Sequence, residues 1–77
     1  MTGTLSDLTP GQSATISGFR DHGPVTQRMM SLGVLAGTDV KMIRLAPAGD
    51  PMQIELLGYS LSLRRSEAAL INVEDVR

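Results

Sequence analysis

Apolar and polar residues alternate along much of this chain, and that pattern predicts a series of short β-strands. The alternation is most regular from Met52 to Leu57, and it returns from Tyr59 to Leu63, just beyond Gly58. A period of two places successive side chains on opposite faces of a strand, so each run has one face for the core. Because a single glycine separates the runs, we predict a β-hairpin with a tight turn.

Three further segments have the spacing of strands. Residues 12–19 alternate, residues 71–74 do so over a shorter stretch, and residues 38–46 change parity part-way along. Because a change of parity turns the following side chains to the other face, we predict a β-bulge within residues 38–46. Residues 66–70 precede the last strand and are predicted to form one helical turn capped by Ser66.

One longer helix is predicted from Pro24 to Leu32. Proline suits the first helical position, and Gly33 suits the left-handed residue just beyond a helix end. Apolar residues recur at i, i+4 and i+7 and define one buried face. That face contains Val25, Met29 and Leu32. The outward positions are Thr26, Gln27, Arg28 and Ser31.

These elements together predict a mainly β fold. About five short strands and one helix on 77 residues favour a small closed β-barrel, because closure removes exposed sheet edges. The helix lies between the first and second strands. A chain of this length buries only about 60 to 65% of the surface that its unfolded form exposes, which leaves room for one core. We therefore expect residues 1–77 to form a single domain.

Composition narrows the range of functions. The chain is 42% hydrophobic with a formal net charge of −1, and its only aromatic residues are Phe19 and Tyr59. Low net charge with this aliphatic content disfavours disorder, and the lack of a basic excess or of stacking platforms disfavours nucleic acid as a partner. No apolar run is long enough to cross a bilayer, and the start of the chain lacks a signal-peptide pattern.

The reactive residues do not form a recognisable catalytic or metal-binding set. There is no cysteine, and the single histidine, His22, falls in a turn. The absence of cysteine excludes a disulfide, a thiolate metal cage and a cysteine nucleophile, and it is typical of a reducing compartment. The carboxylates are scattered among turns and outward strand positions, where the default role is solvation. We therefore predict no enzyme activity, no cofactor and no catalytic or metal-ligating residue.

With catalysis and metal binding disfavoured, we predict that the chain acts by binding another molecule. Residues 32–37 place Val34 and Leu35 between two glycines at a helix-to-strand corner. The helix-cap interpretation buries Val34 against the helix. Leu35 is harder to bury in this way, so it is a candidate for an exposed apolar contact. Arg64 and Arg65 close the predicted hairpin and could contact an acidic partner, although charges at a strand end are usually only solvated.

The order and spacing of several short motifs, over nearly the whole chain, resemble the FeoA family of small proteins associated with bacterial ferrous iron uptake. The matching residues are Leu5, Leu8, Pro10, Gly11, Arg28, Leu32, Gly33, Gly37 to Val40, Ala46, Pro47, Gly49 to Pro51, Gly58, Tyr59, Leu61 to Arg64, Glu67 and Ala68. Two positions depart from the family pattern. Ala36 stands where proline is common, and Ala48 stands where a larger apolar residue is usual.

The resemblance implies an SH3-like barrel and an accessory, non-enzymatic role on the cytoplasmic side of the membrane transporter FeoB, where it could modulate the G-protein domain. It implies a cytoplasmic protein that does not itself insert into the membrane. The candidate partner contacts are Arg28, Val34 and Leu35. An alternative is a metal-responsive regulatory domain like the SH3-like domain of iron-dependent repressors, with His22 and nearby carboxylates as weak ligands. An open sheet edge would also allow weak self-association.

Overall fold

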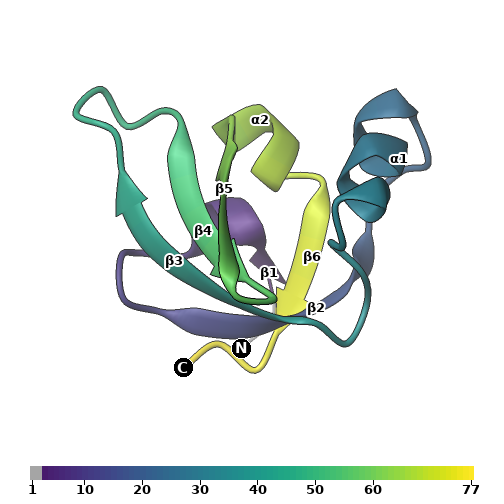
Figure 1. The fold of residues 1–77 in the computed structure, drawn as a ribbon, viewed down its shortest axis with the longest axis horizontal. Coiled ribbons are helices and arrows are strands. Elements are labelled where there is room, and N and C mark those ends of the chain that lie inside the picture. The colour runs from purple at the N-terminus through teal and green to yellow at the C-terminus, as the bar shows by residue number, and fades with distance from the viewer. Residues whose placement is uncertain (1–2) are drawn as a thin grey trace.

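The computed structural model describes residues 3–77, which fold around one six-stranded antiparallel sheet (Figure 1). The sheet order is β1-β6-β2-β3-β4-β5, so β6 lies between the edge strand β1 and β2. The elements in chain order are β1 (Gly3–Thr4), the 3-10 helix η1 (Leu5–Asp7), β2 (Ser13–Phe19), α1 (Pro24–Ser31), β3 (Asp39–Leu45), β4 (Met52–Leu56), β5 (Tyr59–Leu63), α2 (Arg65–Ala68) and β6 (Ile71–Glu74).

The five predicted strands correspond to β2 through β6, and the helix lies between β2 and β3 as predicted. The bulge predicted in β3 is present, between Met42 and Arg44. The short strand β1 was not predicted. The prediction of a closed barrel was wrong, because within residues 3–77 β1 and β5 lie at the two ends of the strand order and do not pair. Among residues 3–77, β1 pairs with β6 at Gly3 and Thr4, and the chain then enters η1.

The hairpin of β4 and β5 follows the predicted pattern. The inward side chains of β4 are all buried; these are Met52, Ile54 and Leu56. The two turn residues, Leu57 and Gly58, have φ angles of 51° and 82°, which is the backbone of a type I′ turn. Along β5, burial falls from Leu63, which is in the core, to Tyr59, which is 38% exposed. The turn end of the hairpin therefore projects beyond the core.

Helix α1 begins at Pro24 and is followed by Gly33, whose φ of 92° confirms the predicted left-handed position. Met29 is buried as predicted, but Leu32 is 39% exposed because it lies at the C-cap, beyond the last helical residue. Thr26 was predicted to face outward, and this was wrong. Its side chain is buried, and its hydroxyl donates a hydrogen bond of 2.6 Å to the carboxylate of Asp21.

Helix α2 begins at Arg65 and is not capped by Ser66, so that prediction was wrong. The carboxylate of Glu67 instead accepts a hydrogen bond of 2.9 Å from the backbone N–H of Arg64, which satisfies a donor at the helix start. The carboxylate of Asp50 accepts another, also 2.9 Å long, from the backbone N–H of Arg65. These two bonds fix α2 against the end of β5 and the loop before β4.

The core is one cluster of buried apolar side chains, to which η1, α1, α2 and strands β2 to β6 all contribute. Within residues 3–77, neither the length nor the hydropathy of any helix suffices for a membrane crossing. The molecule measures 29 × 24 × 23 Å along its principal axes. Because the core occupies the interior, any recognition site must lie on the surface.

Candidate functional site

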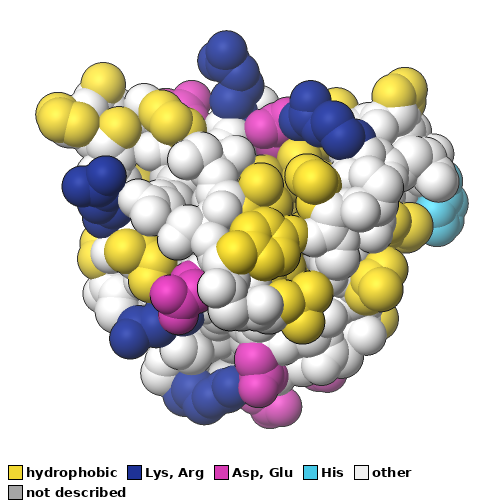
Figure 2. Space-filling view, viewed as in Figure 1, with side chains coloured by type: hydrophobic (Ala, Val, Ile, Leu, Met, Phe, Trp, Pro, Cys, Tyr) yellow, Lys and Arg dark blue, Asp and Glu magenta, His cyan; other side chains and the backbone are white. Residues whose placement is uncertain are grey.

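Four large apolar side chains are exposed within residues 3–77. They are Leu32 (39% exposed), Leu35 (50%), Leu57 (68%) and Tyr59 (38%). They come from the end of α1, the corner after it, the β4–β5 turn and the start of β5, and we call them the corner patch. Figure 2 shows hydrophobic side chains gathered in the middle of this face, over β5 and toward α1. Large exposed apolar side chains that cluster in this way are typical of interaction sites.

Two contacts connect the Leu32 end of the corner patch to Leu57 and Tyr59. The hydroxyl of Tyr59 donates a hydrogen bond to the backbone carbonyl of Leu32. The side chain of Leu57 lies against Gly33, so closely that a Cβ at that position would be 2.7 Å from Leu57 Cδ1. The hairpin turn and the end of α1 are therefore packed together, although no backbone pairing joins them.

A charged group borders the patch. The guanidinium of Arg28 forms an ion pair with the carboxylate of Glu67, whose other oxygen caps α2. The Arg28 side chain is 59% exposed, whereas that of Glu67 is 16% exposed. Arg28 and Leu32 are four residues apart on α1 and its cap, so they share one side of the helix. The ion pair therefore joins α1 to α2 next to the patch.

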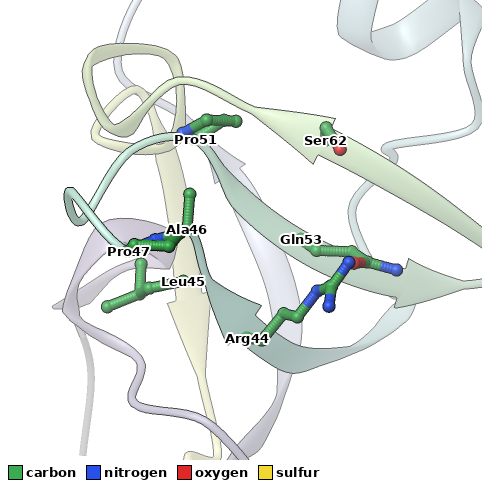
Figure 3. Close-up of a pocket in the computed structure, with 7 residues that line it drawn as sticks. All are labelled: Arg44, Leu45, Ala46, Pro47, Pro51, Gln53 and Ser62. Atoms are coloured by element: carbon green, nitrogen blue, oxygen red, sulfur yellow. The ribbon is translucent and has the colours of Figure 1, made fainter.

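A pocket lies around this ion pair, and a second pocket shares Pro51 and Ser62 with it. The first, of about 330 Å³, is lined by Arg28, Asp50, Pro51, Ser62, Arg64 and Glu67. The other, of about 240 Å³, is lined by Arg44, Leu45, Ala46, Pro47, Pro51, Gln53 and Ser62 (Figure 3). In the second pocket Arg44 and Gln53 point toward each other, and the Arg44 Nε donates a hydrogen bond of 2.9 Å to the Gln53 side chain. The second pocket thus contains one charged side chain and no carboxylate, which gives it no acid–base pair.

The structure separates the three predicted contact residues. Arg28 and Leu35 are exposed on the side of α1 and the corner that follows it, whereas Val34 is fully buried. The helix-cap interpretation therefore applies to Val34, which supports the corner from beneath and cannot reach a partner in this conformation. Sequence reasoning missed Leu57 and Tyr59 as surface residues. Leu57 carried a signal, because it breaks the parity of the inward positions of β4.

Among residues 3–77, Asp21 in the turn before α1 is the carboxyl group with a clear pKa shift. The Thr26 hydroxyl and, to a smaller extent, the Gly23 backbone N–H and nearby His22 lower the pKa of Asp21 from its ordinary value. His22 itself is exposed. Across residues 3–77 no three His, Cys, Asp or Glu side chains converge as a metal site would require. The carboxylate of Asp21 thus acts as an acceptor that fixes the start of α1.

Comparison with known proteins identifies the family. The family model of the FeoA domain matches residues 3–75. The chain belongs to the FeoA family. Over 70 residues it is 34% identical to an Fe(2+) transport protein A/Fe(2+) transporter FeoB fusion protein of Porphyromonas gingivalis, a match that covers 91% of this chain but 8% of that protein. The FeoA family is associated with ferrous iron transport, and in this relative the FeoA part is fused to FeoB.

Solved FeoA structures share the fold. The NMR structure of an FeoA-like protein from Clostridium acetobutylicum has a TM-score of 0.89 and 36% identity, with 95% of this chain and 85% of that chain covered. FeoA of Stenotrophomonas maltophilia complexed with zinc, described as a procaryotic SH3 domain protein, has a TM-score of 0.82 and 29% identity, with 92% and 88% covered. The present chain therefore has the SH3-like FeoA fold, with a sheet that stays open between β1 and β5.

Proposed function

We propose that this chain is an accessory, non-enzymatic binding module of ferrous iron uptake that acts on the cytoplasmic side of an FeoB-like transporter. The observation that supports this most directly is the exposed corner patch on a member of a family that also occurs fused to FeoB. In a fusion the two parts are held at high effective concentration, so a surface for mutual contact would be used. The transporter is therefore the partner that we assign to the patch.

The chemistry of the patch suits a protein partner. Aromatic and arginine side chains are enriched at interface centres, and a polar rim commonly surrounds an apolar core. Here Tyr59 and the three leucines supply the apolar centre, and Arg28 lies on the rim with part of its guanidinium exposed. Of the residues predicted from sequence, Arg28 and Leu35 are the proposed direct contacts, and Val34 positions the corner.

The proposed consequence of binding is a shift in the nucleotide cycle of the transporter's G-protein domain. Such a shift requires that the chain bind one nucleotide state more tightly than another. Binding measured with the GDP-loaded and the GTP-analogue-loaded transporter tests this directly. Equal affinities would remove the modulating role but leave the accessory binding role.

The binding role is tested with full-length FeoB-like transporter of the same cell in detergent, captured on the immobilised chain across a salt series. We expect saturable binding that Leu35→Glu weakens at least tenfold, because a carboxylate in an apolar contact is left desolvated. The matched control is Ala48→Glu, which adds the same charge to the exposed loop between β3 and β4. Unchanged binding by Leu35→Glu would remove the corner patch from the interface.

The metal-responsive alternative makes a separate prediction. If His22 and nearby carboxylates bind a divalent ion, calorimetric titration with ferrous or zinc ions should give saturable heat that His22→Ala abolishes. In residues 3–77 the one polar contact network close to His22 is that of Asp21, Gly23 and Thr26, which serves the start of α1. This arrangement does not favour the alternative over transporter binding.

A further inference from the structure

The two edges of the sheet differ in what they expose. The edge strand β1 spans two residues, whereas the edge strand β5 spans five, from Tyr59 to Leu63. In Figure 1, β5 runs beside β4, which is its one ladder partner among residues 3–77. An edge strand carries backbone N–H and C=O groups that no neighbouring strand uses. The β5 edge is thus the longer unpaired backbone ladder among residues 3–77.

The register identifies the free groups. Leu56 and Tyr59 flank the two-residue turn and are partners in the ladder, so they exchange hydrogen bonds across the hairpin. Antiparallel pairs alternate between bonded and non-bonded positions. The backbone groups of Leu61 therefore bond to β4, whereas those of Ser60 and Ser62 point away from the sheet. Within residues 3–77 the backbone groups of these two serines form no hydrogen bond outside the strand ladder either.

Nothing in the sequence of β5 protects this edge. Natural edge strands are commonly blocked by charged residues, proline, a bulge or extreme shortness. The β5 sequence Tyr-Ser-Leu-Ser-Leu contains no charge and no proline, its pairing with β4 is regular, and both serines are exposed. The corner patch lies at one end of this edge, since Tyr59 is its first residue. Arg64 lies at the other end.

The charges at the Arg64 end favour an acidic residue in the partner. The carboxylate of Glu67 is engaged by Arg28 and the α2 backbone, and that of Asp50 by the same backbone. In residues 3–77 the guanidinium of Arg64 has no hydrogen bond or ion pair, and it lines the pocket that adjoins β5. The unengaged group beside the edge is therefore a cation, which complements a carboxylate.

We propose that the β5 edge binds an extended segment of the transporter, which pairs with Ser60 and Ser62 as an additional strand. The inference rests on the proposed function and specifies its binding mode. Cross-strand neighbours share a face, so residues of the segment beside Tyr59 and Leu61 are apolar and those beside the serines are polar. Arg64 follows Ser60 and Ser62 at the same two-residue spacing, so it lies on the same face as the serines. The carboxylate of the segment that pairs with Arg64 is therefore on the polar face of the segment. This mode is β-augmentation, in which backbone bonds provide affinity and alternate side chains provide specificity.

Proline at the outward-facing positions tests the backbone contacts. Ser62→Pro and Ser60→Pro each remove an N–H that β4 does not use, which edge strands tolerate. Ser62→Ala and Ser60→Ala are the matched controls, because they remove the hydroxyl and keep the N–H. We expect the proline variants to bind the full-length transporter in detergent roughly tenfold more weakly, the loss expected for one or two hydrogen bonds. Each proline variant should bind more weakly than the alanine variant at the same position.

Hydrogen–deuterium exchange gives an independent reading. In the free chain the amides of Ser60 and Ser62 should exchange faster than that of Leu61, and transporter binding should slow both serines. Proline variants that fold and bind normally would overturn the edge proposal while leaving the transporter as partner. Binding that is absent in the original chain would instead remove the proposed function. Protection of both serines in the free chain that rises with its concentration would show a second copy at the edge, and would also overturn the proposal.

Discussion

The hydroxyl of Tyr59 donates a hydrogen bond to the backbone carbonyl of Leu32, a residue 27 positions earlier in the chain. The bond joins the start of the edge strand β5 to the end of α1, where carbonyl groups lack helical partners. Within residues 3–77 no backbone pairing joins β5 to β1, so this side-chain bond is one of the links between β5 and the rest of the molecule. Tyr59 is thus both a structural tie and an exposed part of the corner patch.

Removing that hydroxyl should remove the hydrogen bond to Leu32 and leave the aromatic ring in the corner patch. For Tyr59→Phe we expect the free energy of unfolding to fall by about 0.5 to 1.5 kcal/mol, the net value of one hydrogen bond. Chemical denaturation measures this, with Ser60→Ala as a neighbouring control that should change stability by less than about 0.5 kcal/mol. Equal stability of Tyr59→Phe and the original chain would show that the bond contributes nothing to folding.

Gly33 is predicted to be less replaceable than Gly37, although both have a φ of 92°. Left-handed backbone costs a residue with a Cβ roughly 1 to 2 kcal/mol, so both alanine variants should lose about that much stability. At Gly33 the new Cβ also meets Leu57 at 2.7 Å, whereas at Gly37 there is open space. Because Leu57 Cδ1 is the far end of an exposed, flexible side chain, Leu57 can turn aside at small cost, so the unfolding temperature of Gly33→Ala should be only slightly below that of Gly37→Ala.

A second substitution isolates the contact with Leu57. Leu57 is 68% exposed, so Leu57→Ala alone should cost little. Combined with Gly33→Ala, it should recover the part of the loss that exceeds the loss in Gly37→Ala. Simple additivity of the two changes would mean that Leu57 moves aside freely, since residues in contact normally show an interaction energy.

The ion pair between Arg28 and Glu67 is predicted to make a small, salt-dependent contribution. A double-mutant cycle with Arg28→Gln and Glu67→Gln should give a coupling of about 0.2 to 1 kcal/mol, and glutamine can still cap α2. Raising the salt from 0.1 M to about 1 M should reduce the coupling, because the screening length falls to about 3 Å. The more exposed pair of Arg77 and Asp39 is the control, and its coupling should be smaller. A larger coupling there would contradict the argument from burial.

The pKa of Asp21 is predicted to rise in Thr26→Val, because the Thr26 hydroxyl is the main cause of its lowering. A lowered pKa stabilises the fold at pH values above the unfolded pKa, and this contribution is lost as the pH falls through the folded value. The variant should therefore lose less stability on acidification than the original chain. Carbon-13 NMR titration of the carboxyl measures the pKa. Thr15→Val removes a different hydrogen bond, to Asp39, and should leave Asp21 unchanged.

Much of the fold could be predicted because local patterns decide it. The alternation in β4, the parity change in β3, and the proline and glycine that flank α1 each reflect a constraint within a few residues. The burial of Thr26 could not be predicted from such a local pattern. A hydroxyl looks polar on a helical wheel, and its burial depends on the carboxylate of Asp21 in the preceding turn.

The candidate site was less predictable than the fold for the same reason. Leu35 stood out from its local context, but the corner patch is assembled from segments that only the tertiary structure brings together. The contact of Leu57 with Gly33 links the hairpin turn to the end of α1. The spacing of residues along the chain carries no information about that contact. Barrel closure was overestimated because period-two patterns predict strands but not which strands pair.

The position of β6 constrains when the protein can fold. Residues 71–74 are the last strand in the chain, yet β6 lies between β1 and β2 and pairs with both. The sheet is therefore incomplete until these residues leave the ribosome, and β1 has no partner before then. Contacts between residues so distant in sequence slow folding, because the intervening chain must be closed into a loop first. The hairpin of β4 and β5 is local and can form earlier, so during synthesis the uncharged β5 edge is available before the core beside it is complete.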